Sequence, residues 1–136
     1  MIDRRNLLTA ALACGAIAMS TIAATPAAMA RDAKTFDLKA FETAQGAGKP
    51  ILIDVSAPWC PTCKAQAPIL DQLAAKPKFK DLVVFKIDFD SQKDLLRKFG
   101  VSMQSTLISF KGGAEVARST GSTNAADIEA QLDKSL

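Results

Sequence analysis

The sequence predicts an α/β domain with a central mixed β-sheet that is flanked by helices on both faces. Short apolar segments at 51–56 and 82–88 alternate with segments of helical periodicity, which is typical of strands joined by crossover helices. Two later segments, 106–110 and 114–118, are separated by a pair of glycines and indicate a β-hairpin. Because a hairpin pairs antiparallel strands while crossovers pair parallel ones, the predicted sheet is mixed.

The first 30 residues are predicted to be an export signal that is removed. Arg4 and Arg5 give a charged start, and residues 7–24 carry no charge and are rich in alanine. The segment Ala-Met-Ala that ends at Ala30 has the small-x-small pattern of a signal-peptidase site. We therefore expect cleavage after Ala30, which leaves a single domain over 31–136.

The arginine pair is typical of a twin-arginine signal. Asp3 stands where that pattern usually has Ser or Thr, so a Sec signal remains open. A retained membrane anchor is the alternative, since the 18 residues of 7–24 could just span a bilayer. Small and hydroxylated residues make up more than half of that stretch and weaken its insertion. We interpret Cys14 as part of the removed signal and predict a periplasmic or otherwise exported protein.

The predicted mature chain has 106 residues, which suits one domain with its own core. It keeps 15 basic and 13 acidic residues, a net charge of +2, which favours neither nucleic acid nor a strongly charged partner. It contains no histidine and two cysteines, Cys60 and Cys63. In an oxidising compartment a disulfide between these cysteines is expected.

The first helix is predicted over 37–44, where apolar side chains recur at helical spacing and Asp37 can cap the start. Gly46 and Gly48 are predicted to end this helix. The strand over 51–56 is a continuous apolar run, as in a central strand, and is interrupted only by Asp54 and a terminal serine.

A long helix is predicted over 59–75, and Pro68 inside it should kink it because the proline ring displaces a carbonyl of the preceding turn. The strand over 82–88 is apolar and β-branched. The remaining expectations are a helix over 91–99, capped by Ser91 and ended by Gly100, then the hairpin, and an amphipathic helix over 124–136 with Ile128 and Leu132 facing inward.

The two cysteines are the candidate reactive residues. They lie between the end of a predicted strand and the start of a predicted helix, so that Cys60 occupies the helix N-terminus. Free backbone N–H groups and the positive end of the helix dipole stabilise a thiolate there. We predict that Cys60 attacks disulfides and that Cys63, one helical turn further, resolves the mixed disulfide.

Two other interpretations of the cysteine pair are a structural staple and a metal site. A purely structural disulfide across so short a loop would stabilise the fold by only about 2 kcal/mol, because it restricts the unfolded chain very little. A closed zinc site needs four Cys or His ligands, and the mature chain offers two, so metal would have to be shared between chains. We therefore predict no metal and no cofactor other than the redox-active Cys60–Cys63 disulfide.

Four further residues are assigned to the site. Asp54 is a carboxyl group in a buried strand, where it is harder to ionise and can accept a proton near neutral pH; the alternative is a buried ion pair. Trp59 is predicted to flank the disulfide as part of an exposed apolar surface for partners, with ordinary packing as the alternative. Pro61 and Thr62 lie between the cysteines, where their side chains change the redox potential and meet the substrate.

Across essentially all of 31–136 the sequence resembles the thioredoxin family. The matching segments occur in the family's order, at 51–54 with 57–64, 67–70, 86–88, 99–101 and 110–113. Matches at five places in the family's order are far more specific evidence for the family than the two spaced cysteines alone. The resemblance implies a thioredoxin-like fold and a thiol–disulfide oxidoreductase. It also implies that Asp54 assists Cys63 through a water molecule and that Lys86 on the neighbouring strand tunes Asp54.

The sequence departs from the family before the hairpin, where Gln104, Ser105 and Thr106 stand in place of Ile-Pro-Thr with a cis proline. A cis bond before a non-proline residue costs roughly 2.5–4 kcal/mol, so a trans backbone is expected. The family uses this loop to pair with the substrate backbone and to keep metals off the cysteines. The three residues are therefore substrate-binding candidates, and Ser105 keeps a metal or iron–sulfur scaffold open as an alternative.

The sequence and the resemblance together predict an exported, monomeric protein-disulfide reductase. Asp54, Lys86 and Trp59 match the reductant branch of the family, and a membrane-embedded thiol protein is implied as the electron donor. A disulfide donor or isomerase of the same fold is the alternative within enzymes. Protein disulfides are the predicted substrates.

Overall fold

The computed structural model describes residues 33–136, and the predicted signal over 1–30 lies outside the described residues. Helices and strands alternate along this part of the chain. They are β1 (Lys34–Thr35), α1 (Leu38–Gly46), β2 (Pro50–Ser56), α2 (Pro61–Ala74), the 3₁₀-helix η1 (Pro77–Phe79), β3 (Val83–Asp88), α3 (Lys93–Phe99), β4 (Thr106–Lys111), β5 (Ala114–Thr120) and α4 (Ala125–Asp133). Within 33–136, no helix combines the length and apolar character needed to cross a membrane.

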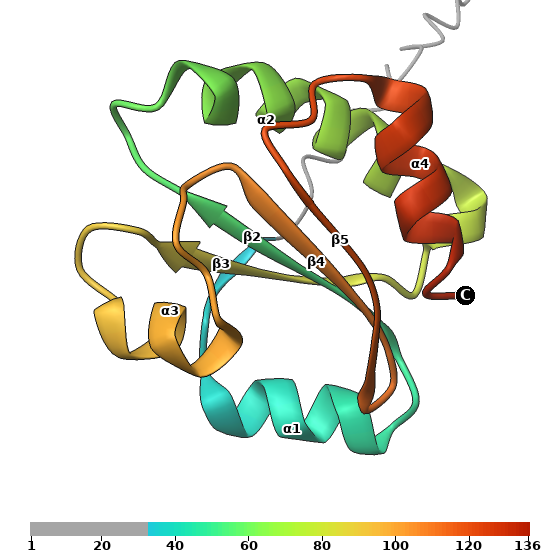
Figure 1. Cartoon of the computed structure of the whole chain (residues 1–136). Helices are drawn as coiled ribbons and strands as arrows, with labels where there is room; N and C mark the ends of the chain where they lie inside the picture. The colour runs from blue at the N-terminus through green and yellow to red at the C-terminus, as the bar shows by residue number, and fades with distance from the viewer. Residues whose placement is uncertain (1–32) are drawn as a thin grey trace, which may run out of the picture.

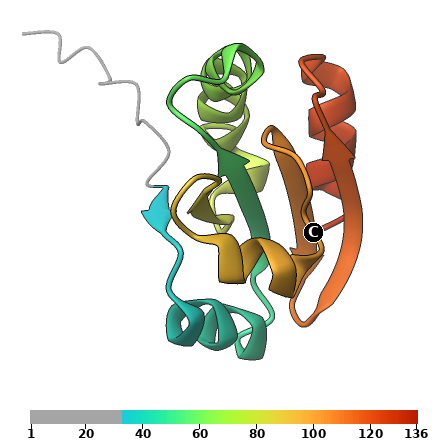
Figure 2. The ribbon, with the colours of Figure 1, turned by 60° about the vertical axis from the view of Figure 1, so that its left-hand side comes forward.

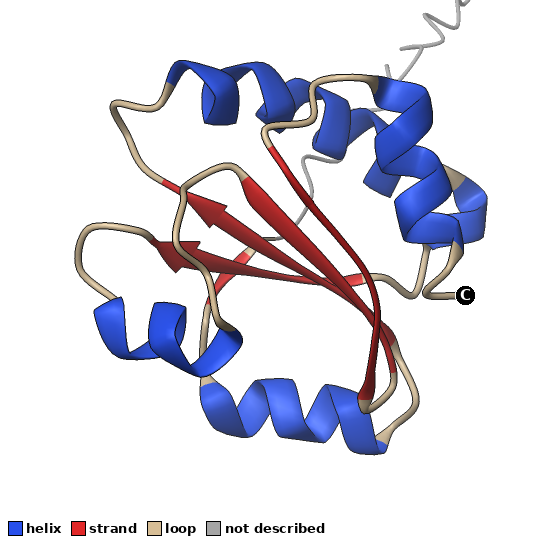
Figure 3. Cartoon of the chain, in the orientation of Figure 1, coloured by secondary structure: helices blue, strands red, loops and turns tan. Residues whose placement is uncertain are grey.

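The five strands form one mixed sheet in the order β1-β3-β2-β4-β5, which confirms the predicted fold class. Strand β2 runs parallel to β3 and antiparallel to β4, and β4 pairs with β5 as the predicted hairpin. Helices α1 and α3 lie on one side of the sheet, while α2 and α4 lie on the other (Figures 1 and 3). The turned view shows the same two layers of helices separated by the strands (Figure 2).

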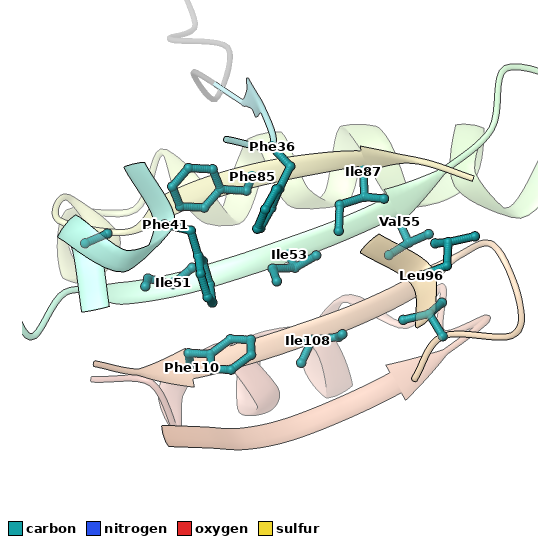
Figure 4. Packing of buried hydrophobic residues seen from close by; sticks show 12 residues of the cluster. Phe36, Phe41, Ile51, Ile53, Val55, Phe85, Ile87, Leu96, Ile108 and Phe110 are labelled. Carbon is teal, nitrogen blue, oxygen red and sulfur yellow. The ribbon is translucent and has the colours of Figure 1, made fainter. Parts of the chain in front are cut away.

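Two apolar clusters fix these layers. Between the sheet and helices α1 and α3, Phe41 packs edge-on against Phe85, Phe99 and Phe110, with ring centroids 5.3–5.8 Å apart. Figure 4 shows how Phe41, Phe85 and Phe110 lie beside the odd-numbered residues of β2. On the opposite face, helices α2 and α4 cover a second cluster that includes Leu52, Leu107, Ile128 and Leu132.

The alternation of β2 decides where its one carboxyl group lies. Successive side chains of a strand point to opposite faces. Ile53 and Val55 belong to the cluster under α1 and α3, whereas Leu52 belongs to the cluster under α2. Asp54 therefore shares the α2 side of the sheet with Leu52, which is the side from which the cysteine-bearing helix covers the strands.

The structure differs from the sequence-based expectation in four elements. The short strand β1 and the helix η1 were not predicted, because two or three residues carry no periodic signal. Helix α2 begins at Pro61 rather than at Trp59. Helix α3 begins at Lys93 with Gln92 as its N-cap residue, so Ser91 does not cap it, and the Ser91 hydroxyl donates to the carboxylate of Asp88 instead.

Candidate active site

The cysteines lie where β2 leads into α2. Cys60 is the N-cap residue of α2 and Pro61 takes the first helical position, where the missing N–H is not needed. The sulfur of Cys60 accepts a hydrogen bond from the backbone N–H of Cys63 at 3.1 Å. Cys60 and Cys63 form a disulfide with their Cα atoms 5.3 Å apart. The helix N-terminus therefore contacts the sulfur that was predicted to be the thiolate.

Burial ranks the two cysteines in the opposite order from the predicted roles. Cys60 is 0% exposed, whereas Cys63 keeps 7% of its surface. Ala57 and Phe89 pack with the two cysteines in a small apolar cluster. Accessibility and thiolate stabilisation therefore favour different cysteines.

Ser105 faces the disulfide from the loop that precedes β4. Its backbone lies in the left-handed region at φ 62°, and the part of the chain that the structure describes contains no cis peptide bond, as expected for a residue other than proline. The hydroxyl oxygen lies 3.1 Å from the Cys60 sulfur and 3.2 Å from the Cys63 sulfur. The side chain that replaces the family's proline therefore touches both redox sulfurs.

Gln66 is a site residue that the sequence did not reveal. It lies on α2 one turn beyond Cys63 and is buried. Its side-chain amide donates to the backbone oxygens of Ser105, at 3.3 Å, and Ser122, at 2.7 Å. Gln66 thus ties the cysteine-bearing helix to the Ser105 loop and to the segment that leads from β5 to α4.

Asp54 and Lys86 meet behind the disulfide. They are paired neighbours on β2 and β3, and Asp54 is buried while Lys86 is exposed. Both line a cleft of about 260 Å³ together with Cys63 and Asp88. A polar cleft of this size holds water easily. The structure therefore brings the predicted proton acceptor, its lysine and the predicted resolving cysteine to one cleft.

Trp59 is held in place at the edge of the site. The residue is 55% exposed, and its indole N–H donates to the carboxylate of Asp90 at 2.8 Å. The Asp90 backbone N–H donates in turn to Asp88 at 2.9 Å. Met103, on the loop before Ser105, is equally exposed. The orientation of Trp59 is thus set by two acidic residues, and Met103 is a second exposed apolar side chain, which was not predicted.

The remaining predicted contact residues differ in their exposure. Pro61 is exposed, while Thr62 and Gln104 are half-buried at the rim of the site. Thr106 is buried, and its hydroxyl donates to the backbone oxygen of Met103 at 2.8 Å. Its side chain therefore faces the fold rather than an incoming substrate.

Asp88, in the loop beside Trp59, makes the stability of the fold depend on pH. The backbone N–H of Ser91, together with the Ser91 hydroxyl, lowers the pKa of Asp88 below its ordinary value. A carboxyl group whose pKa is lower in the folded state stabilises the fold above its unfolded-state pKa, and this contribution is lost as the pH falls through the folded value. We expect Asp88→Asn to lose less stability than the wild type between neutral and acid pH, as measured by urea unfolding. Equal losses would contradict this role.

No cluster of three or more His, Cys, Asp or Glu side chains suited to holding a metal ion is found within 33–136. The polar atoms that surround the sulfurs are instead the hydroxyl of Ser105 and the backbone N–H of Cys63. This arrangement can stabilise negative charge on sulfur, which is what disulfide exchange requires.

Comparisons with known proteins agree with this geometry. Residues 32–134 match the family model described as Thioredoxin. A thioredoxin from Mycobacterium tuberculosis (strain ATCC 25618 / H37Rv) is 39% identical over 84 residues, which cover 62% of this chain and 72% of that protein. A bifunctional thioredoxin reductase/thioredoxin from Mycobacterium leprae (strain TN) is 36% identical over 92 residues, which cover 68% of this chain but 20% of that longer protein.

Among solved structures, Trxlp from Edwardsiella tarda EIB202 is similar to this chain at 46% sequence identity and a TM-score of 0.71. The match covers 74% of this chain and 97% of that one. The mixed sheet, the helices on both faces and these similarities confirm the predicted thioredoxin-like fold.

Proposed function

The chain belongs to the thioredoxin family and is a thiol–disulfide oxidoreductase, and from this premise we propose that it is an exported reductase of protein disulfides. The observation that carries the proposal is the Cys60–Cys63 disulfide at the N-terminus of α2, with a helix N–H directed at the Cys60 sulfur. The protein works without a cofactor, since the cysteine pair itself stores the two electrons.

The reaction follows from the geometry of the pair. The thiolate of Cys60 attacks one sulfur of a substrate disulfide, a mixed disulfide forms, and the other substrate sulfur leaves as a thiolate that takes a proton. Cys63 then loses its proton and attacks the Cys60 sulfur, which releases the second substrate thiolate. The substrate gains two electrons, and the enzyme is left as the Cys60–Cys63 disulfide.

The cleft behind the disulfide supports a role for Asp54 in the second step. Cys63 must be deprotonated to attack, and Cys63 and Asp54 line the same cleft. We assign Asp54 as the acceptor of the Cys63 proton through water, with Lys86 as the charge that adjusts it. Trp59, Pro61 and Thr62 form the surface around the sulfurs on which a substrate chain docks.

Export and the electron source complete the proposal. The charged N-terminal residues and the small-x-small site within 1–30 support export. The proposed protein acts as a monomer. Cytosolic reductants do not reach an exported protein, so a thiol protein embedded in the membrane must return electrons to the Cys60–Cys63 disulfide.

The reduction potential separates the reductase from its nearest alternative. We expect the potential of the cysteine pair, measured by equilibration with glutathione buffers, to lie below that of glutathione. A cysteine pair whose potential lies well above that of glutathione would instead identify a disulfide donor or isomerase, because 30 mV corresponds to about 1.4 kcal/mol for a two-electron couple.

The N-terminus of protein recovered from the exported fraction is expected at Arg31.

A further inference from the structure

The hydroxyl group of Ser105 occupies an unusual place between the two redox sulfurs. It lies almost equally far from them, at 3.1 Å from Cys60 and 3.2 Å from Cys63. Ser105 is only 3% exposed, so water contributes little to satisfying this hydroxyl. Buried hydroxyl groups are nearly always hydrogen-bonded. The partners that the site offers to this one are the sulfurs themselves.

The backbone of Ser105 is held from three directions. Its N–H donates to the backbone oxygen of Val55 in β2 at 2.8 Å. Its carbonyl oxygen accepts hydrogen bonds from the backbone N–H of Gly121, at 3.0 Å, and from the Gln66 amide on α2, at 3.3 Å. In Figure 1 the loop before β4 lies beside the end of β2, where these elements meet.

These contacts hold Ser105 in a backbone conformation that is energetically unfavourable for serine. A serine with a positive φ is strained, and such residues persist where the surrounding structure fixes them. With φ at 62°, the backbone of Ser105 places the side-chain hydroxyl against the two sulfurs. A preorganised donor of this kind loses little entropy when charge develops on its partner.

A sulfur in a disulfide is a weak acceptor, whereas a thiolate carries a full charge, and hydrogen bonds to charged groups are roughly twice as strong as neutral ones. We propose that the Ser105 hydroxyl is a catalytic donor that stabilises whichever of the two sulfurs is the thiolate during exchange. This inference rests on disulfide exchange at Cys60 and Cys63, and it requires neither export nor a particular direction of electron flow.

The hydroxyl serves both steps without giving up its proton. Before attack it donates to the Cys60 thiolate. Once Cys60 is bonded to the substrate sulfur, its charge has passed to the leaving thiolate, and the same hydroxyl can turn toward Cys63 as that residue loses its proton. When Cys63 bonds to Cys60 and the second substrate thiolate departs, the hydroxyl returns to the weak contacts that it makes with the disulfide.

The test measures how Cys60 ionises in the reduced protein. The rate at which iodoacetamide alkylates Cys60 is followed against pH in the full chain carrying Cys63→Ala, with the modified peptide identified by mass spectrometry. Removing the hydroxyl with Ser105→Ala is expected to move the midpoint of this profile upward by about one pH unit, a tenfold change. Ser102→Ala removes an exposed serine hydroxyl from the same loop and is expected to leave the midpoint unchanged.

A second substitution separates the hydroxyl from the backbone. Ser105→Gly also removes the hydroxyl but tolerates φ 62° without strain, so it keeps the loop conformation. If the hydroxyl is the cause, Ser105→Ala and Ser105→Gly shift the midpoint alike. A midpoint unchanged in both variants, or a shift in only one of them, would overturn the proposal.

The reduction potential provides an independent readout with both cysteines present. Because the hydroxyl stabilises the reduced, charged form more than the disulfide, its loss should make the potential more negative. We expect about 30 mV for a tenfold effect in Ser105→Ala. A potential equal to that of the wild type would contradict the inference. Neither readout depends on a protein substrate, so the inference can fail while the proposed reductase activity stands, or the reverse.

Discussion

Cys60→Ser is expected to abolish reduction of insulin in the presence of dithiothreitol, whereas Cys63→Ser is expected to accumulate a covalent complex with its substrate. The serine hydroxyl is not ionised near neutral pH, so a Cys60→Ser enzyme has no nucleophile at the α2 N-terminus. In Cys63→Ser the first attack proceeds, but no thiol remains to break the mixed disulfide. Turbidity of reduced insulin measures the first effect, and non-reducing electrophoresis measures the second.

The third cysteine supplies a matched control. Cys14 lies in the predicted signal, so Cys14→Ser should leave both the rate of insulin reduction and the absence of a trapped complex unchanged. Retention of activity in both Cys60→Ser and Cys63→Ser would show that disulfide exchange does not run through this pair. The trapped complex would also identify physiological substrates when Cys63→Ser is expressed with its signal in the exported compartment.

Ser105→Pro, which restores the family's usual residue, is expected to destabilise this protein by at least about 2 kcal/mol. Proline fixes φ near −65°, whereas Ser105 has a φ of 62°. Proline also lacks the N–H that donates to the carbonyl of Val55 at 2.8 Å, which would leave that carbonyl without its partner. The free energy of unfolding from urea denaturation measures the loss.

Ser105→Gly is the control for this effect, because it keeps the N–H and accommodates the positive φ. We expect it to unfold at a denaturant concentration close to that of the wild type. A Ser105→Pro variant as stable as the wild type would mean that the loop takes up the family's proline conformation without cost. The hydrogen bond to Val55 would then contribute nothing to stability.

Most of the fold could be predicted because its elements carry local signals. Asp37 does cap α1, and Gly100 ends α3 in the left-handed conformation. The prediction was wrong where a side chain had a stronger partner elsewhere. Ser91 is a good capping residue in isolation, but α3 has Gln92 as its N-cap residue, and the Ser91 hydroxyl turns back to donate to the carboxylate of Asp88. A pattern of residue types does not reveal that competition.

The sequence predicted the site residues that are recognised from local features, but not the contacts between site residues that lie far apart in the sequence. Cys60 and Cys63 were identified from their spacing and from the change of strand to helix, which are local features. Gln66 and Asp90 act through contacts with residues that are 31 or more positions away in the sequence. Gln66 did leave one usable signal, since helical periodicity places it on the buried face of α2, where a polar side chain needs a partner.

Cys60, although the more buried of the two cysteines, is the attacking thiolate in the proposed mechanism. The most direct test is to treat the reduced wild-type protein with less than one equivalent of iodoacetamide near neutral pH and to map the modified cysteine by mass spectrometry. The helix N-terminus and the Ser105 hydroxyl favour a thiolate at Cys60, so we predict that the label is found on Cys60. A label found mainly on Cys63, the more exposed of the two cysteines, would contradict the assignment of Cys60 as the attacking thiolate.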